Sequence, residues 1–389
     1  MDLNKIPEIA KYLSIVFLVA WIGRSTVWNF LPIYFEREIA SVFLVGILTS
    51  LPAAIPVLID IPIGNLVQRA GEKVVIFSGL LISIFPGIAY LTAIPILLAA
   101  GKMIEGLTKS MVWIGGWSLS LTSSDDAVES ETVSVFLLGV NITAVLGPVI
   151  GGYLIYAYGF SVPLYLWIMS ATLSVIVFTS YIGLSTKIKL KDSVEQLFER
   201  RTYQDDWKHI KKNWSNLRLP LTLIFLYSII FSFFWLAIPL LLDEMGANFI
   251  QMGLIFGAAA FPSLFQYIFG DIADKHGELK LVTILSIILI VVLGAMSTIE
   301  SVLLIGAFFL IARLFVSGMS PPIHSIYDAR VPDDLEGELT GFFELAKHSG
   351  QAIGPTLAGA IASIWTLGAS FLMAAIVSLI ILGITIRER

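Results

Sequence analysis

The sequence predicts an all-α membrane protein with twelve transmembrane helices arranged as two pseudo-symmetric six-helix bundles. Three observations lead to this prediction. Hydrophobic residues make up 57% of the 389 residues and charged residues only 14%, whereas soluble proteins contain about 25% charged residues. The apolar residues form long segments without the alternation that is typical of a membrane β-barrel. The two halves of the chain also carry similar motifs, about 207 residues apart, as expected of a duplicated transport fold.

The twelve expected helices follow from the length of the apolar segments, because a helix needs roughly 20 residues to cross a bilayer. Such segments occupy residues 12–34, 42–66, 74–92, 95–121, 133–156, 163–184, 219–242, 250–272, 280–298, 302–322, 339–364 and 368–386. Six of them precede one long polar stretch and six follow it. We therefore expect an N-terminal bundle over residues 1–184, a cytoplasmic amphipathic linker over 185–218 and a C-terminal bundle over 219–389.

The distribution of lysine and arginine predicts the orientation in the membrane. These residues concentrate at both ends of the chain and in the loops after even-numbered spans, whereas the opposite loops hold only Arg37. Because cytoplasmic loops are rich in lysine and arginine, we expect both termini on the cytoplasmic side of the plasma membrane. The first apolar segment has no cleavage site behind it and is interpreted as a retained helix. The expected linker mixes basic and aromatic residues, which is typical of an amphipathic helix on the anionic leaflet; a solvated tether is the alternative.

The first repeated motif follows the second span of each half. It reads G-N-L-V-Q-R-A-G-E-K over residues 64–73 and G-D-I-A-D-K-H-G over residues 270–277. Its glycines predict a tight turn, and its charged residues predict exposed ion pairs that contribute about 0–1 kcal/mol each. The motif is interpreted either as a cytoplasmic gate or as a turn with solvated charges. The gate candidates are Gly64, Arg69, Gly71, Lys73, Gly270, Asp274, Lys275 and Gly277.

The second repeated motif lies in the fifth span of each half. It reads G-P-V-I-G-G over residues 147–152 and G-P-T-L-A-G over residues 354–359. Proline removes one backbone hydrogen bond, and glycine lets a neighbouring helix approach closely. The motif is interpreted either as a pivot or as ordinary helix packing. The helix-kink candidates are Gly147, Pro148, Gly151, Gly152, Gly354 and Pro355.

These motifs resemble the major facilitator superfamily over essentially the full length of the chain. In that family the loop after the second helix carries a pattern similar to G-x-L-A-D-R-x-G-R-K and helps to latch the two bundles; here Gln68 replaces the aspartate. The G-P-x-x-G-G pattern is associated with the family's proton-driven exporters, so the resemblance implies the twelve-helix drug:proton antiporter type. It also implies that helices 1, 4, 7 and 10 line a cavity and that helices 3, 6, 9 and 12 face lipid.

Charged residues deep within the spans avoid the four helices that the resemblance assigns to lipid. An ionised side chain at mid-bilayer costs about 3 kcal/mol or more, so it must face protein or water. A polar translocation path would produce this distribution, although ion pairs that only join helices would explain part of it. The deep charges are Arg24, Asp60, Lys102, Glu105, Lys109, Arg313, Glu344 and Lys347.

The deep acidic residues and histidines are candidates for proton coupling, which requires a group that can gain and lose a proton. The candidates, in order, are Asp60, Glu344 and His348. Asp60 is equally well interpreted as a static partner of Arg24. Glu105 has a lysine about one turn to either side, which keeps it ionised and favours a role in organising ion pairs.

A midplane cavity between two halves is where transporters of this type bind substrate. The deep charges carry a net positive charge, which suits an anionic or neutral solute, and neighbouring aromatic residues offer an apolar wall. The cavity candidates are Arg24, Trp28, Lys102, Glu105, Lys109, Asn141, Trp235, Arg313 and His324.

The predicted function is secondary active transport by alternating access. The leading hypothesis is proton-coupled export of a small organic solute or drug, and the alternative is a proton-coupled carrier of an anionic metabolite, organic or phosphorylated. We expect a monomer whose partners are the lipid bilayer, a small-molecule substrate and protons. With zero cysteines and no phosphate-binding or His-Glu-x-x-His motif, the sequence predicts no cofactor, metal or nucleic acid. An intramembrane enzyme or a sensor is the other class considered, but neither a catalytic motif nor a soluble effector segment is present.

Overall fold

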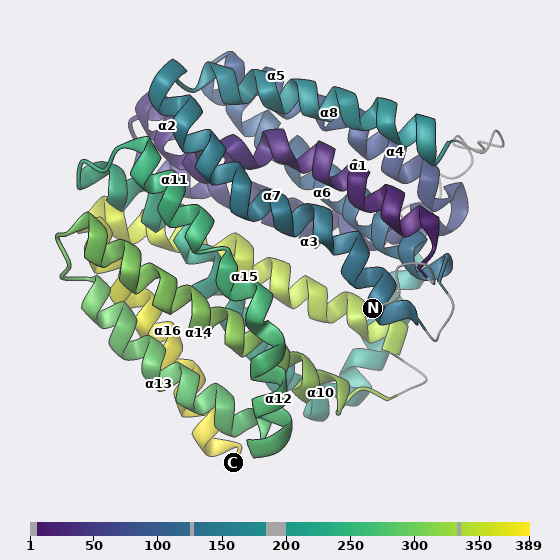
Figure 1. Ribbon diagram of the computed structural model, residues 1–389. Helices are drawn as coiled ribbons and strands as arrows, with labels where there is room; N and C mark the ends of the chain where they lie inside the picture. Colours follow the sequence, from purple (N-terminus) through teal and green to yellow (C-terminus); the bar gives the residue numbers. More distant parts are fainter. Residues whose placement is uncertain (1–5, 125–127, 184–199, 333–335) are drawn as a thin grey trace. The chain divides into compact units, whose positions relative to one another are not determined.

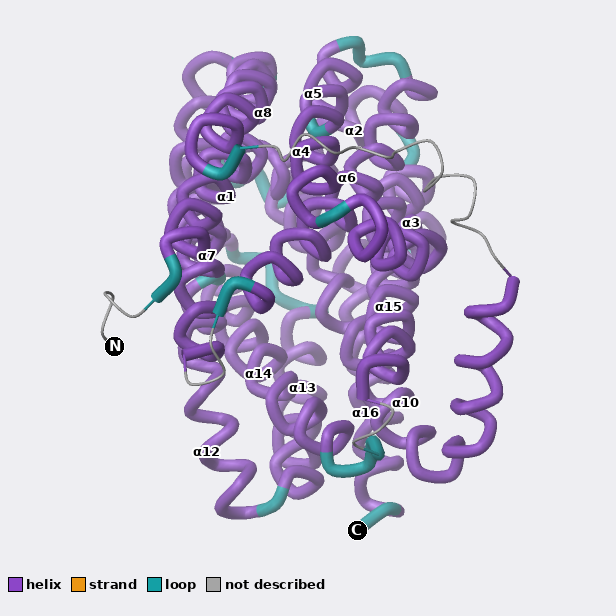
Figure 2. The backbone as a smooth tube through the Cα atoms, turned by 90° about the vertical axis from the view of Figure 1, so that its right-hand side faces the viewer, coloured by secondary structure: helices purple, strands orange, loops and turns teal. Residues whose placement is uncertain are grey.

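The computed structural model describes residues 6–124, 128–183, 200–332 and 336–389 (Figure 1). These residues form helices joined by short loops, and no strand occurs among them (Figure 2). In chain order the elements are α1 (Glu8–Val27), the 3-10 helix η1 (Trp28–Phe30), α2 (Leu31–Ile39), α3 (Val42–Ala70), α4 (Glu72–Ile82), α5 (Ile84–Leu91), α6 (Pro95–Thr122), α7 (Glu129–Tyr158), α8 (Ser161–Tyr181), α10 (Arg200–Glu244), α11 (Phe249–Ala258), the 3-10 helix η3 (Phe261–Phe265), α12 (Gln266–His276), α13 (Glu278–Met296), α14 (Val302–Asp328), α15 (Glu336–Ile364) and α16 (Leu367–Arg387).

Each expected span falls on one helix or on a run of consecutive helical segments. Among the described residues, ten such helices or runs are long and apolar enough to cross a membrane. The expected spans 95–121 and 339–364 lie on α6 and α15, which are outside these ten because they carry many of the polar side chains of the candidate site. The all-helical fold is therefore confirmed, and the count of twelve crossings stays a prediction.

Breaks in the helices occur where proline or serine competes with the backbone hydrogen-bond ladder. The first expected span passes through η1 just before Pro32, which has no backbone N–H to donate. The third expected span is broken between α4 and α5, where the Ser83 hydroxyl donates to the carbonyl of Leu80 at 2.6 Å. These breaks matter for the site, because Trp28 lies on η1 and Tyr90 on α5.

The contacts divide the chain into two compact units. Unit 1 comprises Met1–Asn29 and Leu58–Glu199, and unit 2 comprises Phe30–Val57 and Arg200–Arg389. The segment from residue 30 to 57 belongs to unit 2, where Ser50 Oγ lies 2.8 Å from Thr356 Oγ1. The boundaries 1–184, 185–218 and 219–389 stay predictions. Of the expected linker, residues 185–199 lie outside the described residues, and 200–218 are the first part of α10.

The core of unit 1 forms where α1 packs along α7 and α8 (Figure 1). Its largest buried side chains include Phe17 of α1, Phe136 of α7 and Phe178 of α8, each with no exposed surface. The rings of Phe17 and Phe136 meet edge to face at 4.8 Å, an arrangement that contributes beyond simple burial. This core holds α1 in place, and α1 carries Arg24.

Each unit contains a close helix contact, and the two contacts lie at matching positions of the sequence repeat. A Cβ atom added at Gly147 of α7 would overlap Ser25 of α1, and one added at Gly354 of α15 would overlap the hydroxyl of Ser232 on α10. The glycines and the serines are separated by the same offset along the chain, so the repeat seen in sequence is repeated in packing. Small residues allow such close approach of helices in a membrane, where apolar burial alone does not distinguish one contact from another.

Candidate functional site

The carboxylate of Glu105 is the centre of a buried polar cluster in unit 1. Its Oε1 accepts hydrogen bonds from Arg24 Nη2 at 2.7 Å, Arg24 Nε at 3.2 Å and Trp28 Nε1 at 2.8 Å. Its Oε2 accepts from Tyr90 Oη at 2.9 Å and Lys102 Nζ at 3.0 Å. The structure thus brings together four of the residues that the sequence analysis selected, and it adds Tyr90.

Two cations share the single carboxylate of this cluster. Glu105 is 2% exposed and Lys102 3% exposed, while the Arg24 side chain is 19% exposed. The Arg24 guanidinium also lies 5.6 Å from the centre of the Trp28 ring, and Lys102 Nζ lies 6.0 Å from it, within range of a cation–π interaction. Five donors stabilise the charged form of the carboxyl, and the cluster carries one net positive charge.

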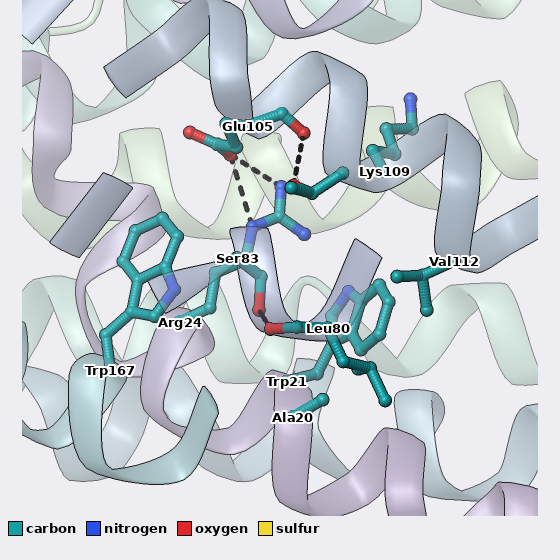
Figure 3. A pocket seen from close by; sticks show the side chains of 10 residues that line it. Ala20, Trp21, Arg24, Leu80, Ser83, Glu105, Lys109, Val112 and Trp167 are labelled. Atoms are coloured by element: carbon teal, nitrogen blue, oxygen red, sulfur yellow. Dashed lines mark hydrogen bonds and ion pairs between the residues drawn. The ribbon is translucent and has the colours of Figure 1, made fainter. Parts of the chain in front are cut away.

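A small cavity adjoins the cluster on the side of Arg24 (Figure 3). Its volume is about 30 Å³, enough for roughly two water molecules. Arg24, Glu105 and Lys109 line it together with Trp21 and Trp167. Figure 3 shows the Lys109 side chain extending away from the carboxylate of Glu105, so the lysines one turn to either side of Glu105 differ: Lys102 binds it, and Lys109 does not point at it.

Asp60 of α3 lies in unit 1 and accepts a hydrogen bond from Ser110 Oγ of α6 at 2.5 Å. Ser110 is 3% exposed. The sequence analysis left open whether Asp60 pairs with Arg24 or carries a proton. In the structure, the ion pair of Arg24 is with Glu105.

Arg313 of α14 is a half-buried deep cation of unit 2. Its guanidinium carbon lies 4.6 Å above the ring of Phe231 on α10, and its Nε donates to the carbonyl of Ala259 at 3.5 Å, a marginal distance for a hydrogen bond. Within the described part of the chain, Arg313 forms no ion pair. Phe231 in turn contacts Trp235 one turn further along α10, with ring centres 5.8 Å apart.

The candidates on α15 form a second polar group in unit 2. Lys347 Nζ donates to both carboxylate oxygens of Glu344, at 2.8 and 2.9 Å. His348 Nε2 lies 3.7 Å from the same carboxylate, and its Nδ1 lies 3.2 Å from Gln351 Oε1. Two of the three candidates for proton coupling are therefore neighbours.

His324 borders the polar group of α15, because it interacts electrostatically with Glu344 and Lys347, whereas Asn141 lies on α7 of unit 1. The Nδ1 of His324 on α14 lies 2.8 Å from the carbonyl of Ser320, and its ring packs edge to face on Phe343 at 4.8 Å. Asn141 is exposed on α7. The assignment of both residues to a substrate cavity therefore stays a prediction.

The two copies of the first motif form the same turn. Gly71 at the start of α4 has φ +88°, and Gly277 at the start of α13 has φ +92°, a region that glycine enters without steric cost. A Cβ added at Gly64 would meet no atom within 4 Å. Lys73 Nζ donates to the carbonyl of Ile182 at 3.2 Å, which joins α4 to the end of α8. The turn is observed, and the gate role of Gly64, Arg69, Gly71, Lys73, Gly270, Asp274, Lys275 and Gly277 stays a prediction.

The second motif lies inside uninterrupted helices, because α7 continues through Pro148 and α15 through Pro355. In addition to the Gly147 and Gly354 contacts, a Cβ at Gly151 would overlap the carbonyl of Thr26. Close packing is thus observed at the motif, whereas a pivot stays a prediction; Gly152 is buried in the same turn.

Tyr90 and Ser110 are the site residues that sequence reasoning missed. Tyr90 has no exposed surface, although it lies on the third expected span, a position that the family resemblance assigns to lipid. A lone tyrosine in an apolar segment carries no sequence signal for such a contact. Ser110 carries a weak signal, because it follows Lys109 on the charged helix, but serine in a spanning helix often bonds only to its own backbone.

The comparisons with known proteins agree with this fold. The model of the Major Facilitator Superfamily matches residues 13–347 and, in a second match, residues 220–388. A curated relative from Bacillus subtilis (strain 168), described as the uncharacterized MFS-type transporter YuxJ, is 23% identical over 268 residues, which are 66% of either chain. This chain therefore spans about two thirds of that relative's length.

Solved structures resemble the chain over nearly its whole length. The alignment with the nucleoside transporter NupG has a TM-score of 0.75 at 13% sequence identity and covers 97% of this chain and 99% of the NupG chain. The human organic anion transporter MFSD10 gives 0.68 at 15% identity, with 97% and 98% covered. An occupied, inward-facing bacterial homolog of the human lysosomal transporter Spinster gives 0.75 at 13%, with 98% and 96% covered. These structures show the fold, and with the match of the family model the chain belongs to the Major Facilitator Superfamily.

Proposed function

We propose that the protein is a secondary active transporter that moves a small organic anion across the plasma membrane by alternating access, driven by protons. The observation that carries the proposal is Arg313. A buried cation in a spanning helix costs several kcal/mol unless it is compensated. Arg313 has an aromatic face at Phe231 and one marginal bond to Ala259, but no ion pair within the described residues. A substrate anion would supply the missing charge reversibly.

The charge inventory of each unit supports an anionic substrate. In unit 1, Arg24 and Lys102 share the single carboxylate of Glu105, which leaves this cluster with a net positive charge. In unit 2, Glu344 and Lys347 neutralise each other, which leaves the charge of Arg313. A permanent cation would be repelled by both groups.

The proton is proposed to bind at Asp60. One of its partners, Ser110, offers a hydroxyl, which can donate to a carboxylate or accept from a carboxylic acid, so this hydrogen bond survives in both protonation states. Glu105, by contrast, is surrounded by five donors that only a carboxylate satisfies. Glu344 and His348 follow Asp60 as candidates, because Lys347 binds Glu344 directly.

The test is uptake into proteoliposomes under an imposed pH gradient, with a panel of labelled organic anions and neutral hydrophobic compounds and with protein-free liposomes as a blank. We expect Arg313→Gln to abolish accumulation of the anion. Arg218→Gln is the matched control, because Arg218 is exposed on α10, and it should transport normally. Undiminished anion uptake by Arg313→Gln would overturn the assignment of an anionic substrate.

Proton-coupled export of a neutral hydrophobic compound is the second candidate, as in a drug:proton antiporter. The observation that favours it is the close packing of Gly147 and Gly151 on α1, at the motif that the family's proton-driven exporters carry. Efflux of a neutral dye that persists in Arg313→Gln, together with no anion uptake by the unaltered protein, would select this candidate. In either case we propose a monomer with both termini cytoplasmic.

A further inference from the structure

The membrane-spanning part of α10 has a partly exposed aromatic face next to Arg313. From Leu223 to Leu242 every residue of α10 is buried except Phe225, Phe231 and Trp235. Phe231 and Trp235 are one turn apart, so they lie on the same face of the helix. Two large rings that are partly accessible on one face of an otherwise buried helix offer a surface for a flat apolar ligand.

Arg313 fixes the orientation in which an anion can approach. Phe231 covers one face of the guanidinium at 4.6 Å, and the Nε points to the carbonyl of Ala259. The terminal N–H groups therefore remain for a ligand that approaches in the plane of the guanidinium. Two parallel donors in one plane match the two oxygens of a carboxylate. The charge of Arg313, which has no ion-pair partner among the described residues, also matches a monoanion better than a dianion.

The charge and the aromatic face lie close enough to bind one small molecule. Phe231 contacts both groups: the guanidinium carbon of Arg313 lies 4.6 Å from the centre of its ring, and the ring centre of Trp235 lies 5.8 Å from it. Tyr227 continues the row in the opposite direction, with its ring centre 5.9 Å from that of Phe231. We propose that the transported anion is an aryl carboxylate, whose carboxylate binds Arg313 and whose ring packs against Trp235. This inference rests on the proposed function and names its substrate class.

The test is equilibrium binding to the purified full-length protein in detergent, measured by titration calorimetry. The probes are 3-phenylpropanoate and 3-cyclohexylpropanoate, which have the same charge and nearly the same length and differ in the ring. We expect the unaltered protein to prefer the phenyl compound by about fivefold, from the usual strength of aromatic contacts. Trp235→Leu should remove this preference, and continued binding of the cyclohexyl compound by the variant would show that it is folded. Arg313→Gln should weaken both compounds at least tenfold.

Trp214→Leu is the matched control, because Trp214 is an exposed tryptophan on the same helix, and its preference should equal that of the unaltered protein. If Trp235→Leu keeps the phenyl preference, the aromatic assignment is wrong while the anion proposal stands. Binding of a phosphate monoester or a sulfonate but of neither carboxylate would also overturn the assignment of an aryl carboxylate. If no anion binds and neutral compounds do, the proposed function fails together with this inference.

Discussion

Replacing Glu105 with glutamine tests the buried cluster most directly. The variant keeps the shape of the side chain and removes the charge that Arg24 and Lys102 share. A glutamine amide offers one acceptor oxygen in place of two, so either Arg24 or Lys102 faces an NH₂ group. Because Lys102 is only 3% exposed, water cannot solvate its ammonium in exchange.

The expected cost follows from the burial of the pair. Removing one member of a buried ion pair costs about 3–5 kcal/mol, because the remaining charge stays uncompensated. Here two cations remain, so we expect a loss of about 3–5 kcal/mol in the free energy of unfolding. Adding Lys102→Met to Glu105→Gln should recover part of this loss, because it removes one uncompensated buried charge.

The assay is reversible unfolding in mixed micelles of dodecylmaltoside and sodium dodecyl sulfate, followed by tryptophan fluorescence. Glu244→Gln is the control, because Glu244 is exposed at the end of α10 and its replacement should change stability by less than about 0.5 kcal/mol. If Glu105→Gln destabilises no more than this control, the cluster does not hold unit 1 together. If Lys102→Met fails to recover any stability, the cost does not come from the uncompensated charge.

Three further predictions concern packing, conformational change and coupling. Gly151→Leu should lower the free energy of unfolding by about 1–3 kcal/mol, because its side chain would overlap the carbonyl of Thr26. Gly64→Ala is the control and should not lower it, because a Cβ at that position meets no atom within 4 Å. Equal free energies of unfolding for the two variants would contradict this prediction. Ser50→Cys combined with Thr356→Cys should form a disulfide on oxidation, since the two hydroxyls lie 2.8 Å apart and the chain has no other cysteine. Because both residues belong to unit 2, the cross-linked protein should transport normally; a loss of transport that is restored by reduction would show that this contact opens during the transport cycle. Asp60→Asn should abolish accumulation against a gradient and preserve counterflow exchange, and uphill accumulation by this variant would move the proton site elsewhere.

Much of the fold could be predicted from the sequence because the lipid bilayer restricts which backbone structures are possible. Long apolar segments can satisfy their backbone polar groups only as helices in a bilayer, so the positions of the helices followed from composition and length. The repeat was also visible, and the matched contacts of Gly147 with Ser25 and of Gly354 with Ser232 give it a packing counterpart. The glycine turns at residues 71 and 277 followed from the motif for the same reason: only glycine adopts that backbone conformation without strain.

The candidate site was predicted as a set of charged residues, without their partners. Spacing placed Lys102 and Glu105 on one face of a helix, and the structure confirms that they are in contact. The sequence left open whether Arg24 pairs with Asp60, however, and the family resemblance assigned the span of Tyr90 to lipid. In the structure, Arg24 and Tyr90 both bind Glu105.

The sequence by itself determined that this chain is helical and membrane-embedded, that it contains an internal repeat and that its deep charged residues lie on a few helices. Each of these properties follows from local composition and periodicity. Only the tertiary structure decided that Arg24 binds Glu105 and that Arg313 lies over Phe231. The physical reason is that lipid solvates every apolar helix face about equally well, so hydrophobicity does not specify which faces meet. Close contacts at glycines and a few buried hydrogen bonds choose the rotation of each helix, and these are visible only once the helices are packed.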